Sequence, residues 1–213
     1  MNTREIREYK KTLKLSKLQR QILIGTLLGD GHLETQDNGR TFRLKVEHSS
    51  KQREYVEWLH TNFKDWVRNG IYEKKRIDGR EHIGFVTYSH GALRFYAHQF
   101  YDGKKKRIPV QIAKLLSPMA LAIWYMDDGS WKSNAHKTFI IHTVGFAKEE
   151  LEKVKGVLKK NFNIEVNLHR QKEKYWRLYV VSDSAERFAE LVKSYISLVP
   201  SLLYKLGNRM PKE

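Results

Sequence analysis

LIGTLLGDG, residues 23–31, and LAIWYMDDG, residues 121–129, are two apolar segments that both end on Asp-Gly within one chain of 213 residues. A helix start signal precedes each of them. Ser16 opens a Ser-Lys-Leu-Gln capping box, and Ser117-Pro118 places a capping serine before a proline at the first helical position. The sequence therefore predicts two apolar helices that end at these dipeptides, with Gly31 and Gly129 as left-handed residues just beyond them.

A repeat extends beyond these two helices. The spacing from Asp30 to Asp128 is matched to within one residue by the spacing from Phe42 to Phe139. In each half, a strand pair, an amphipathic helix, a second hairpin and a closing helix follow the apolar helix in the same order. The sequence therefore predicts a duplicated αββαββα unit.

The strands of the first half indicate how the sheets are built. A hairpin turns at Asn38-Gly39, and residues 42–47 alternate apolar and charged side chains, so that one face is buried and the other is charged. We therefore predict a mixed α+β fold with pseudo-two-fold symmetry, with one unit at residues 1–106 and the other at residues 107–213.

The net charge of the chain indicates what kind of molecule it binds. The chain carries 40 Lys and Arg residues against 24 Asp and Glu residues, a net charge of +16, and such a field favours a polyanion, with nucleic acid as the first candidate. The alternative is a merely soluble basic protein. The absence of cysteine excludes disulfides, thiolate zinc sites and cysteine nucleophiles, and the histidines show no metal-ligand spacing.

The cellular setting follows from what the sequence lacks. No apolar run approaches the roughly 18 residues that a membrane-spanning helix needs, and no secretory signal opens the chain. We expect no membrane contact and an intracellular protein, in the cytoplasm of a prokaryote or in an organelle matrix.

The aspartates at the two helix ends are the candidate functional residues. A helix C-terminus has a partial negative charge, so an aspartate there is mildly unfavourable, and a single Asp-Gly is read as a simple turn. Two at matching positions of a repeat predict a shared site, because side-by-side helices would bring Asp30 and Asp128 together. Gly25 and Gly29 would permit the close approach, and divalent cations with oxygen ligands would compensate the two carboxylates.

The two segments resemble the paired signature of the LAGLIDADG homing endonucleases, in the single-chain form that carries both motifs. The similarity spans nearly the whole chain, and SPMALAIWYMDDG, KKKRIP and VPSLLYKL resemble the I-SceI-like branch. The acid of the motif falls on Asp30 and Asp128. The position before it holds Gly29 in the first copy and Asp127 in the second, and the register with Asp30 favours Asp128 as the second motif acid.

The resemblance implies a metal-dependent phosphodiester hydrolase. Asp30 and Asp128 would bind Mg2+, with the backbone carbonyls of Gly29 and Asp127 as further ligands. One lysine per half would sit near the metals, and the matching residues here are Lys106 and Lys205. Mn2+ is expected to substitute for Mg2+, and Ca2+ to support binding without cleavage.

The resemblance also implies two antiparallel sheets that form a saddle over double-stranded DNA, with the motif helices at the centre and no protein partner, as a monomer. Candidate contacts to base edges in the major groove are Arg43, Lys45, Lys74, Arg76, Lys132, Lys137, His169 and Arg177. Candidate contacts to phosphates, at turns, are Arg40, Arg80 and Lys172.

Three functions remain open at this point. The first is a sequence-specific endonuclease that cuts both strands of a long asymmetric target. The others are an intron RNA maturase and a non-catalytic DNA-binding regulator on the same fold. The presence of both acids and both lysines favours the first, because a protein that only binds does not need all four.

Overall fold

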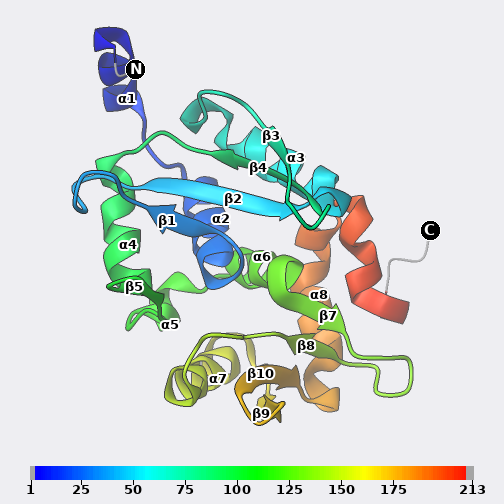
Figure 1. Cartoon of the computed structure of the whole chain (residues 1–213). Coiled ribbons are helices and arrows are strands. Elements are labelled where there is room, and N and C mark those ends of the chain that lie inside the picture. Colours follow the sequence, from blue (N-terminus) through cyan, green and yellow to red (C-terminus); the bar gives the residue numbers. More distant parts are fainter. Residues whose placement is uncertain (1–2, 210–213) are drawn as a thin grey trace.

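Two apolar helices form the centre of the molecule in the computed structural model, which describes residues 3–209 (Figure 1). Helix α2 (Lys17–Leu28) begins with the predicted capping box, in which the backbone N–H of Gln19 donates to Ser16 Oγ at 3.1 Å. Helix α6 (Pro118–Asp128) begins after Ser117, whose hydroxyl accepts from the backbone of the third helical residue. Both helices are buried over most of their circumference, as expected of helices at the centre of a core.

Glycines set the distance between α2 and α6. A Cβ atom at Gly25 would lie 2.4 Å from Ile123 Cβ, and one at Gly29 would lie 2.3 Å from Asp127 Oδ2. No real side chain tolerates such contacts, so the helices pass at a separation that only glycine allows. The predicted role of these two glycines is confirmed.

The predicted left-handed backbone at Gly31 and Gly129 is wrong. Gly129 has a φ of −85°, and Gly31 is not among the residues with positive φ. Both glycines are required by space instead, since a Cβ at Gly129 would lie 2.1 Å from the Tyr125 ring and one at Gly31 would lie 2.9 Å from Thr26 Cβ.

The same order of elements follows each central helix, as the repeat predicts. The first half continues with β1 (His32–Glu34), β2 (Arg43–Ser49), α3 (Arg53–Phe63), β3 (Tyr72–Lys75), β4 (Glu81–Val86) and α4 (Arg94–Phe100). The second half continues with β7 (Gly129–Trp131), β8 (Phe139–Ile141), α7 (Lys148–Phe162), β9 (Val166–Gln171), β10 (Tyr175–Val180) and α8 (Ala185–Ile196).

The remaining elements lie at the ends and at the junction. They are α1 (Arg4–Thr12), β5 (Tyr101–Asp102), β6 (Lys105–Lys106), α5 (Ile112–Leu115) and the 3-10 segments η1 (Ser50–Gln52), η2 (Lys64–Trp66), η3 (Gly91–Leu93), η4 (Ser182–Ser184) and η5 (Pro200–Arg209). Residue 106, the end of the first predicted unit, is the last residue of β6. Across residues 3–209, no helix has the length and apolarity that crossing a membrane would require.

Each half contains one antiparallel four-stranded sheet. The strand orders are β1-β2-β4-β3 and β7-β8-β10-β9, so the two sheets have the same topology. Residues at the turns match the predicted hairpins, with positive φ at Asn38 (55°) and Gly39 (83°) in the first half and at Lys172 (48°) and Glu173 (53°) in the second. The α+β duplication is therefore confirmed.

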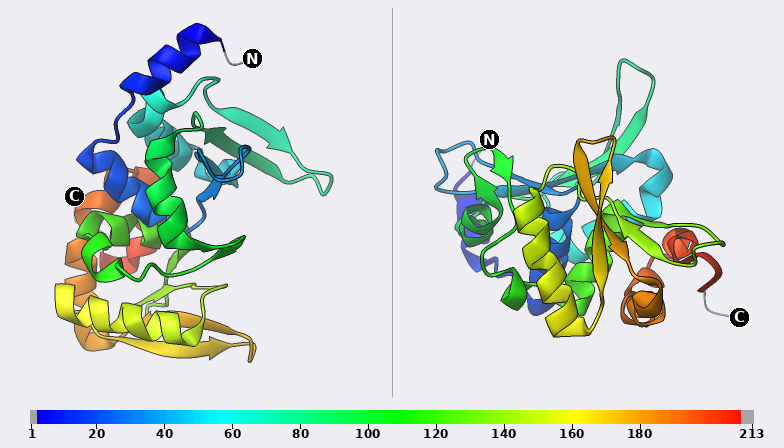
Figure 2. Two further views of the ribbon diagram at one scale, coloured as in Figure 1. Left: turned by 90° about the vertical axis from the view of Figure 1, so that its left-hand side faces the viewer. Right: turned by 90° about the horizontal axis from the view of Figure 1, so that it is seen from below.

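A helix covers one face of each sheet, and the other face is open. Along β2, Leu44 and Val46 are buried beneath α3, while Arg43 and Lys45 lie on the open face. Helix α7 packs on β9 and β10 in the same way. The β3–β4 and β9–β10 hairpins project from the same side of the helical body, as Figure 2 (left) shows. This arrangement gives the molecule the predicted saddle form.

Candidate functional site at the paired helix ends

Asp127 lies at the interface between the two central helices, and its carboxylate reaches across into the first half. Its Oδ2 atom accepts a hydrogen bond from the backbone N–H of Asp30 at 3.0 Å. The Asp127 side chain is fully buried, whereas that of Asp30 is 49% exposed. The acid that touches the other half is therefore the residue before the second motif acid, a contact that the sequence did not predict.

Tyr55 and His48 complete the surroundings of Asp127. The Tyr55 hydroxyl donates to Asp127 Oδ1 at 2.7 Å, and His48 Nε2 lies 3.9 Å from the same oxygen. His48 Nδ1 lies 3.1 Å from Gln52 Oε1 and 3.5 Å from Asp30 Oδ2. Asp30, His48 and Asp127 thus offer one ligand atom each within 4.8 Å of one another.

Sequence reasoning missed His48 as part of this group. The signal that could have found it is its phase in β2, because a histidine follows Leu44 and Val46 on the buried face of the strand. Its side chain is only 2% exposed, and its Nε2 atom has no hydrogen-bond partner among the described residues.

Asp128 faces a pocket at the end of α6. Its Oδ2 accepts from Trp124 Nε1 at 3.2 Å, which fixes the carboxylate against its own helix. Asp30, Lys106 and Gly29 line the same pocket. The structure therefore brings the two predicted motif acids and one predicted lysine together.

Two lysines bind the ends of the central helices in matching ways. Lys106, from β6, donates to the backbone carbonyl of Gly29 at 2.5 Å. Lys205, from η5, donates to the carbonyls of Met126 at 2.5 Å and Asp127 at 3.3 Å. Carbonyls at a helix C-terminus lack partners within the helix, so each lysine satisfies groups that would otherwise be left unpaired. The two lysines thus make equivalent contacts at the ends of α2 and α6.

Burial governs the protonation of the site. It raises the pKa of Asp127 to about 8, and the charge of Asp30 adds to the effect. It likewise raises the pKa of Asp128 to about 8, with the charges of Asp127 and Asp30 adding. Burial lowers the pKa of Lys106 and of Lys205, although the three aspartates oppose that shift. Ionising both buried acids therefore requires more positive charge than the lysines supply, and oxygen donors of this kind suit a divalent cation.

The candidate DNA contacts lie on the open faces and at the loops of the two sheets. In the first half, Arg43 and Lys45 lie on β2, Lys74 on β3, Arg76 and Arg80 around the β3–β4 turn, and Arg40 in the β1–β2 loop. In the second half, Lys132 and Lys137 lie in the β7–β8 loop, His169 on β9, Lys172 at the β9–β10 turn, and Arg177 on β10.

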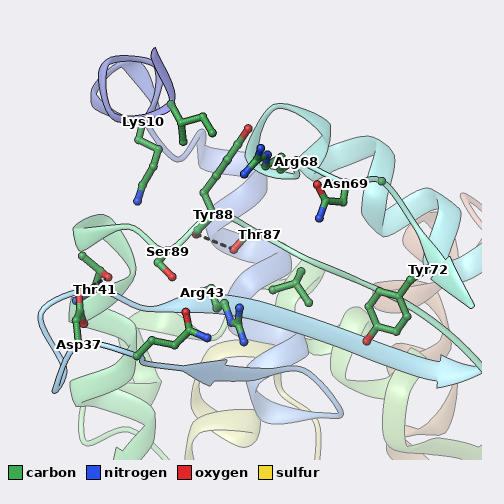
Figure 3. Close-up of a pocket in the computed structure, with 14 residues that line it drawn as sticks. Lys10, Asp37, Thr41, Arg43, Arg68, Asn69, Tyr72, Thr87, Tyr88 and Ser89 are labelled. Atoms are coloured by element: carbon green, nitrogen blue, oxygen red, sulfur yellow. Dashed lines mark hydrogen bonds between the residues drawn. The ribbon is translucent and has the colours of Figure 1, made fainter. Parts of the chain in front are cut away.

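A polar hollow extends the open face of the first sheet toward α1. Arg43 and Tyr72 belong to its lining, and Lys10 points into it from α1, as Figure 3 shows. Arg68 and Asn69 line it from the segment that follows η2. Its described lining residues include none of the motif acids or the two lysines, so the hollow is separate from the site at the helix ends.

Comparison with known proteins gives concordant results. “Probable intron-encoded endonuclease 1” of Wickerhamomyces canadensis is 33% identical over 215 residues, which cover 96% of this chain and 91% of that protein. The cytochrome b mRNA maturase bI2 of Debaryomyces hansenii is 30% identical over 207 residues, covering 92% and 76%. The homing endonuclease I-WcaI, solved bound to its DNA recognition sequence, superposes with a TM-score of 0.84 at 31% identity, covering 96% of this chain and 93% of that one.

The family assignment rests on a match that includes both motif helices. The model of the LAGLIDADG DNA endonuclease family matches residues 20–188, well over half of the chain. The matched residues include both Asp-Gly segments and Lys106, and Lys205 lies beyond them. The chain belongs to the LAGLIDADG DNA endonuclease family.

Proposed function

We propose that this chain is a site-specific endonuclease that hydrolyses both strands of a long, asymmetric double-stranded DNA target. The observation that carries the proposal is the placement of Asp30, Asp128 and Lys106 around one pocket, at the junction of two sheets that carry basic side chains. The related I-WcaI, with the same fold over 96% of this chain, was solved bound to its DNA recognition sequence.

The site fits a divalent cation. The motif acids Asp30 and Asp128 line one pocket. Burial raises the pKa of Asp127 and Asp128, so their ionised forms need a compensating positive charge. We propose Mg2+ as the natural ion, held by Asp30 and Asp128 with the carbonyls of Gly29 and Asp127, with Mn2+ as a substitute and Ca2+ supporting binding alone. When bound, the ion supplies Lewis acidity toward the scissile phosphate and lowers the pKa of an attacking water.

The protein's own residues position these groups. Lys106 and Lys205 hold the two helix ends and place positive charge where the transition state gains negative charge. Asp127 holds the backbone of Asp30 through its N–H, and Trp124 holds the carboxylate of Asp128. The two acids are therefore oriented by different contacts, although they occupy matching positions in the repeat.

The binding surface is divided between the halves. We propose that residues 1–106 and 107–213 form two units that each contact one half of the target, through the basic side chains placed above on each sheet. Because the paired helices of one chain already form the interface between the units, a monomer suffices. A DNA substrate implies an intracellular setting, in a prokaryote or an organelle matrix.

A second candidate function is RNA maturation. The relative from Debaryomyces hansenii that is 30% identical to this chain is named as a cytochrome b mRNA maturase, so the same fold accompanies that name. The maturase reading does not require the motif acids, and their substitution therefore distinguishes the two functions.

The test substitutes each motif acid by its amide. Asp30→Asn and Asp128→Asn keep the side-chain shape but remove the charge that binds the cation, so each is expected to slow plasmid linearisation in Mg2+ at least 100-fold. Binding to the same DNA in Ca2+ is expected to stay within a few-fold of the parent, since affinity comes from the sheets.

Glu165→Gln is the matched control, because it removes one carboxylate that pairs with Lys159 on an exposed surface. It is expected to cut like the parent. If both Asp30→Asn and Asp128→Asn linearise plasmid at the parental rate, the proposed nuclease mechanism is wrong.

A further inference from the structure

Glu47 is a carboxylate on the open, basic face of the first sheet, and basic groups surround it. Arg76 donates to its Oε1 at 3.0 Å, Tyr72 donates to its Oε2 at 3.1 Å, and Lys74 Nζ lies 3.5 Å from the same oxygen. The Glu47 side chain is 11% exposed, much less than the 46% of Arg76 or the 48% of Lys74. The acid thus lies beneath a layer of cations that face outward.

Glu34, on the neighbouring strand β1, is a second carboxylate that basic groups surround. Its Oε2 accepts from Nε and from a terminal nitrogen of Arg43, at 3.0 and 2.9 Å, and its Oε1 lies 3.0 Å from His32 Nε2. Lys45 lies 3.8 Å from both Glu34 and Glu47, and so it joins the two groups. His82 Nδ1 lies 3.6 Å from Glu47 Oε1. We call this connected set the first-sheet network: His32, Glu34, Arg43, Lys45, Glu47, Tyr72, Lys74, Arg76 and His82.

These contacts restrict how the cations can point. An arginine or lysine on a surface normally samples many rotamers, and ordering it on binding costs free energy. Arg43 is held by two hydrogen bonds to Glu34, and Arg76 by one to Glu47. Burial alone would raise the pKa of Glu47, but the contacts from Arg76, Tyr72 and the nearby lysines lower it to about 2, so the acid stays ionised.

The open face of the second sheet is built differently. The strand register places eight side chains on this face, and none of them is a carboxylate: Ser130, Ile140, Asn167, His169, Gln171, Tyr175, Arg177 and Tyr179. The Nε atom of Arg177 is buried without a hydrogen-bond partner among residues 3–209. His169 stacks on Tyr179 with ring centroids 4.6 Å apart.

We propose that Glu34 and Glu47 are specificity-determining positioning residues, and that the two halves read DNA unequally. The first-sheet network presents a fixed array of donors that discriminates base edges, and the second sheet contributes affinity with weaker discrimination. The inference rests on the proposed function only in taking double-stranded DNA as the ligand; it does not depend on cleavage.

The proposal predicts a direction that a merely structural role would not. A carboxylate that faces a polyanion opposes binding, so its removal should strengthen binding to any DNA. The same change releases Lys74 and Arg76 from their fixed positions, so the distinction between right and wrong bases should weaken. Affinity and specificity are therefore expected to change in opposite senses.

The experiment is a binding selection in Ca2+ from a randomised double-stranded DNA library, with sequencing of the bound fraction. Glu47→Gln and Glu34→Gln are compared with the parent, and a gel-shift on unrelated DNA gives the non-specific affinity. Each variant is expected to bind unrelated DNA about 2- to 10-fold more tightly, with a log–log salt slope steeper by up to about 0.9. Base preference is expected to weaken over one half-site only.

Glu165→Gln controls for the change in net charge, because Glu165 pairs with Lys159 away from the open face. It is expected to leave base preference intact. Unchanged preference in Glu47→Gln and Glu34→Gln, or equal loss over both half-sites, would overturn the proposal. A parent protein that retains no DNA from the library would overturn the proposed function together with it.

Discussion

Asp127 shows how a single residue sets the chemistry of this site. It is fully buried, it accepts hydrogen bonds from Tyr55 and from the backbone of Asp30, and it lies beside Asp128 in the sequence. Both neighbouring acids have a pKa raised to about 8 by burial. The raised pKa values favour the protonated form of both acids at neutral pH, and this has a measurable consequence for stability.

A raised pKa in the folded state means that unfolding releases protons, so the contribution of these acids to stability falls as pH rises from about 4 to about 8. Asn at position 128 cannot ionise, so Asp128→Asn removes the part of this loss that Asp128 contributes and leaves the part from Asp127. We expect its Tm without metal to exceed that of the parent increasingly toward pH 8, by roughly 2–4 °C for each kcal/mol regained. Thermal unfolding in EDTA across this pH range measures it, and a pH-independent difference would contradict the assignment.

Tyr55→Phe tests the contact that positions Asp30. The change removes the hydroxyl that donates to Asp127 at 2.7 Å and leaves the ring in its buried place. Because Asp127 holds Asp30 and Trp124 holds Asp128, only the first acid is affected. Loss of one such hydrogen bond is worth about 1 kcal/mol, so one strand is expected to be cut about 3- to 10-fold more slowly.

The measurement is the time course of nicked and linear plasmid, with strand-specific labels. The parent serves as reference, and Trp124→Phe, which removes the donor to Asp128, is expected to slow the opposite strand. An equal slowing of both strands by Tyr55→Phe would show that Asp127 acts on both acids.

At the scale of residues, the sequence predicted that Asp30 and Asp128 would lie close together, and they line one pocket, but it did not predict their contacts. Asp30 and Asp128 are candidates from their register in the repeat, and Lys106 and Lys205 are candidates from the family resemblance. The contact between Tyr55 and Asp127 joins residues that are 72 positions apart, and no local pattern reports it. What the sequence did show was an aspartate at the position that Gly29 occupies in the first copy.

The central helices and the glycines between them govern the structure at the scale of elements. A Cβ atom at Gly25 would lie 2.4 Å from Ile123 Cβ and 2.7 Å from the carbonyl oxygen of Ala120. Gly25→Ala must therefore push α2 and α6 apart. We expect it to lower the free energy of unfolding by about 1–3 kcal/mol, as overpacking does in other cores.

Gly156→Ala is the matched control, because Gly156 lies within α7 and its Cβ would meet nothing within 4 Å. The same substitution there is expected to raise the free energy of unfolding by about 0.5–1 kcal/mol through helix propensity alone. Urea unfolding of both variants gives the comparison. A stability of Gly25→Ala equal to or above that of the parent would contradict the close approach of the helices, and a loss of stability in Gly156→Ala would contradict the propensity argument.

Elements were predictable where the signal is local. Periodicity and capping residues predicted α2, α6 and the hairpins, since those features depend on neighbours in the chain. The short β5–β6 pair that carries Lys106 was not predicted, because two residues per strand show no alternation. Gly31 and Gly129 were assigned a backbone conformation that they do not have, because a glycine required by a neighbouring side chain looks the same in sequence.

The duplicated architecture of the whole molecule makes a second copy unnecessary. The interface between the halves is formed within one chain by α2 and α6, and η5 adds a contact in which the backbone N–H of Ser201 donates to Glu54 of α3 at 2.8 Å. We expect sedimentation to show a monomer over the whole accessible concentration range. A dimer that persists on dilution would contradict this expectation.

Binding by this surface should depend strongly on salt. The net charge is +16, and each phosphate that the protein neutralises contributes roughly −0.9 to the slope of log affinity against log salt concentration. With basic side chains on both sheets, we expect several phosphates to be neutralised and the slope to be steeper than about −3. A titration in potassium chloride with Ca2+ present measures it, and a flat response would show that the basic side chains do not meet the phosphates.

Gly29 and Asp127 make the two halves non-interchangeable. A molecule built from two copies of the first half would place glycine opposite glycine, leaving the Tyr55 hydroxyl and the Asp30 amide without their acceptor. Two copies of the second half would force an aspartate side chain into space where 2.3 Å separates a Cβ from a carboxylate oxygen. The glycine of one half leaves the space that the aspartate of the other half fills. A chimaera that exchanges one half with a relative therefore has to inherit residues 29 and 127 as a pair.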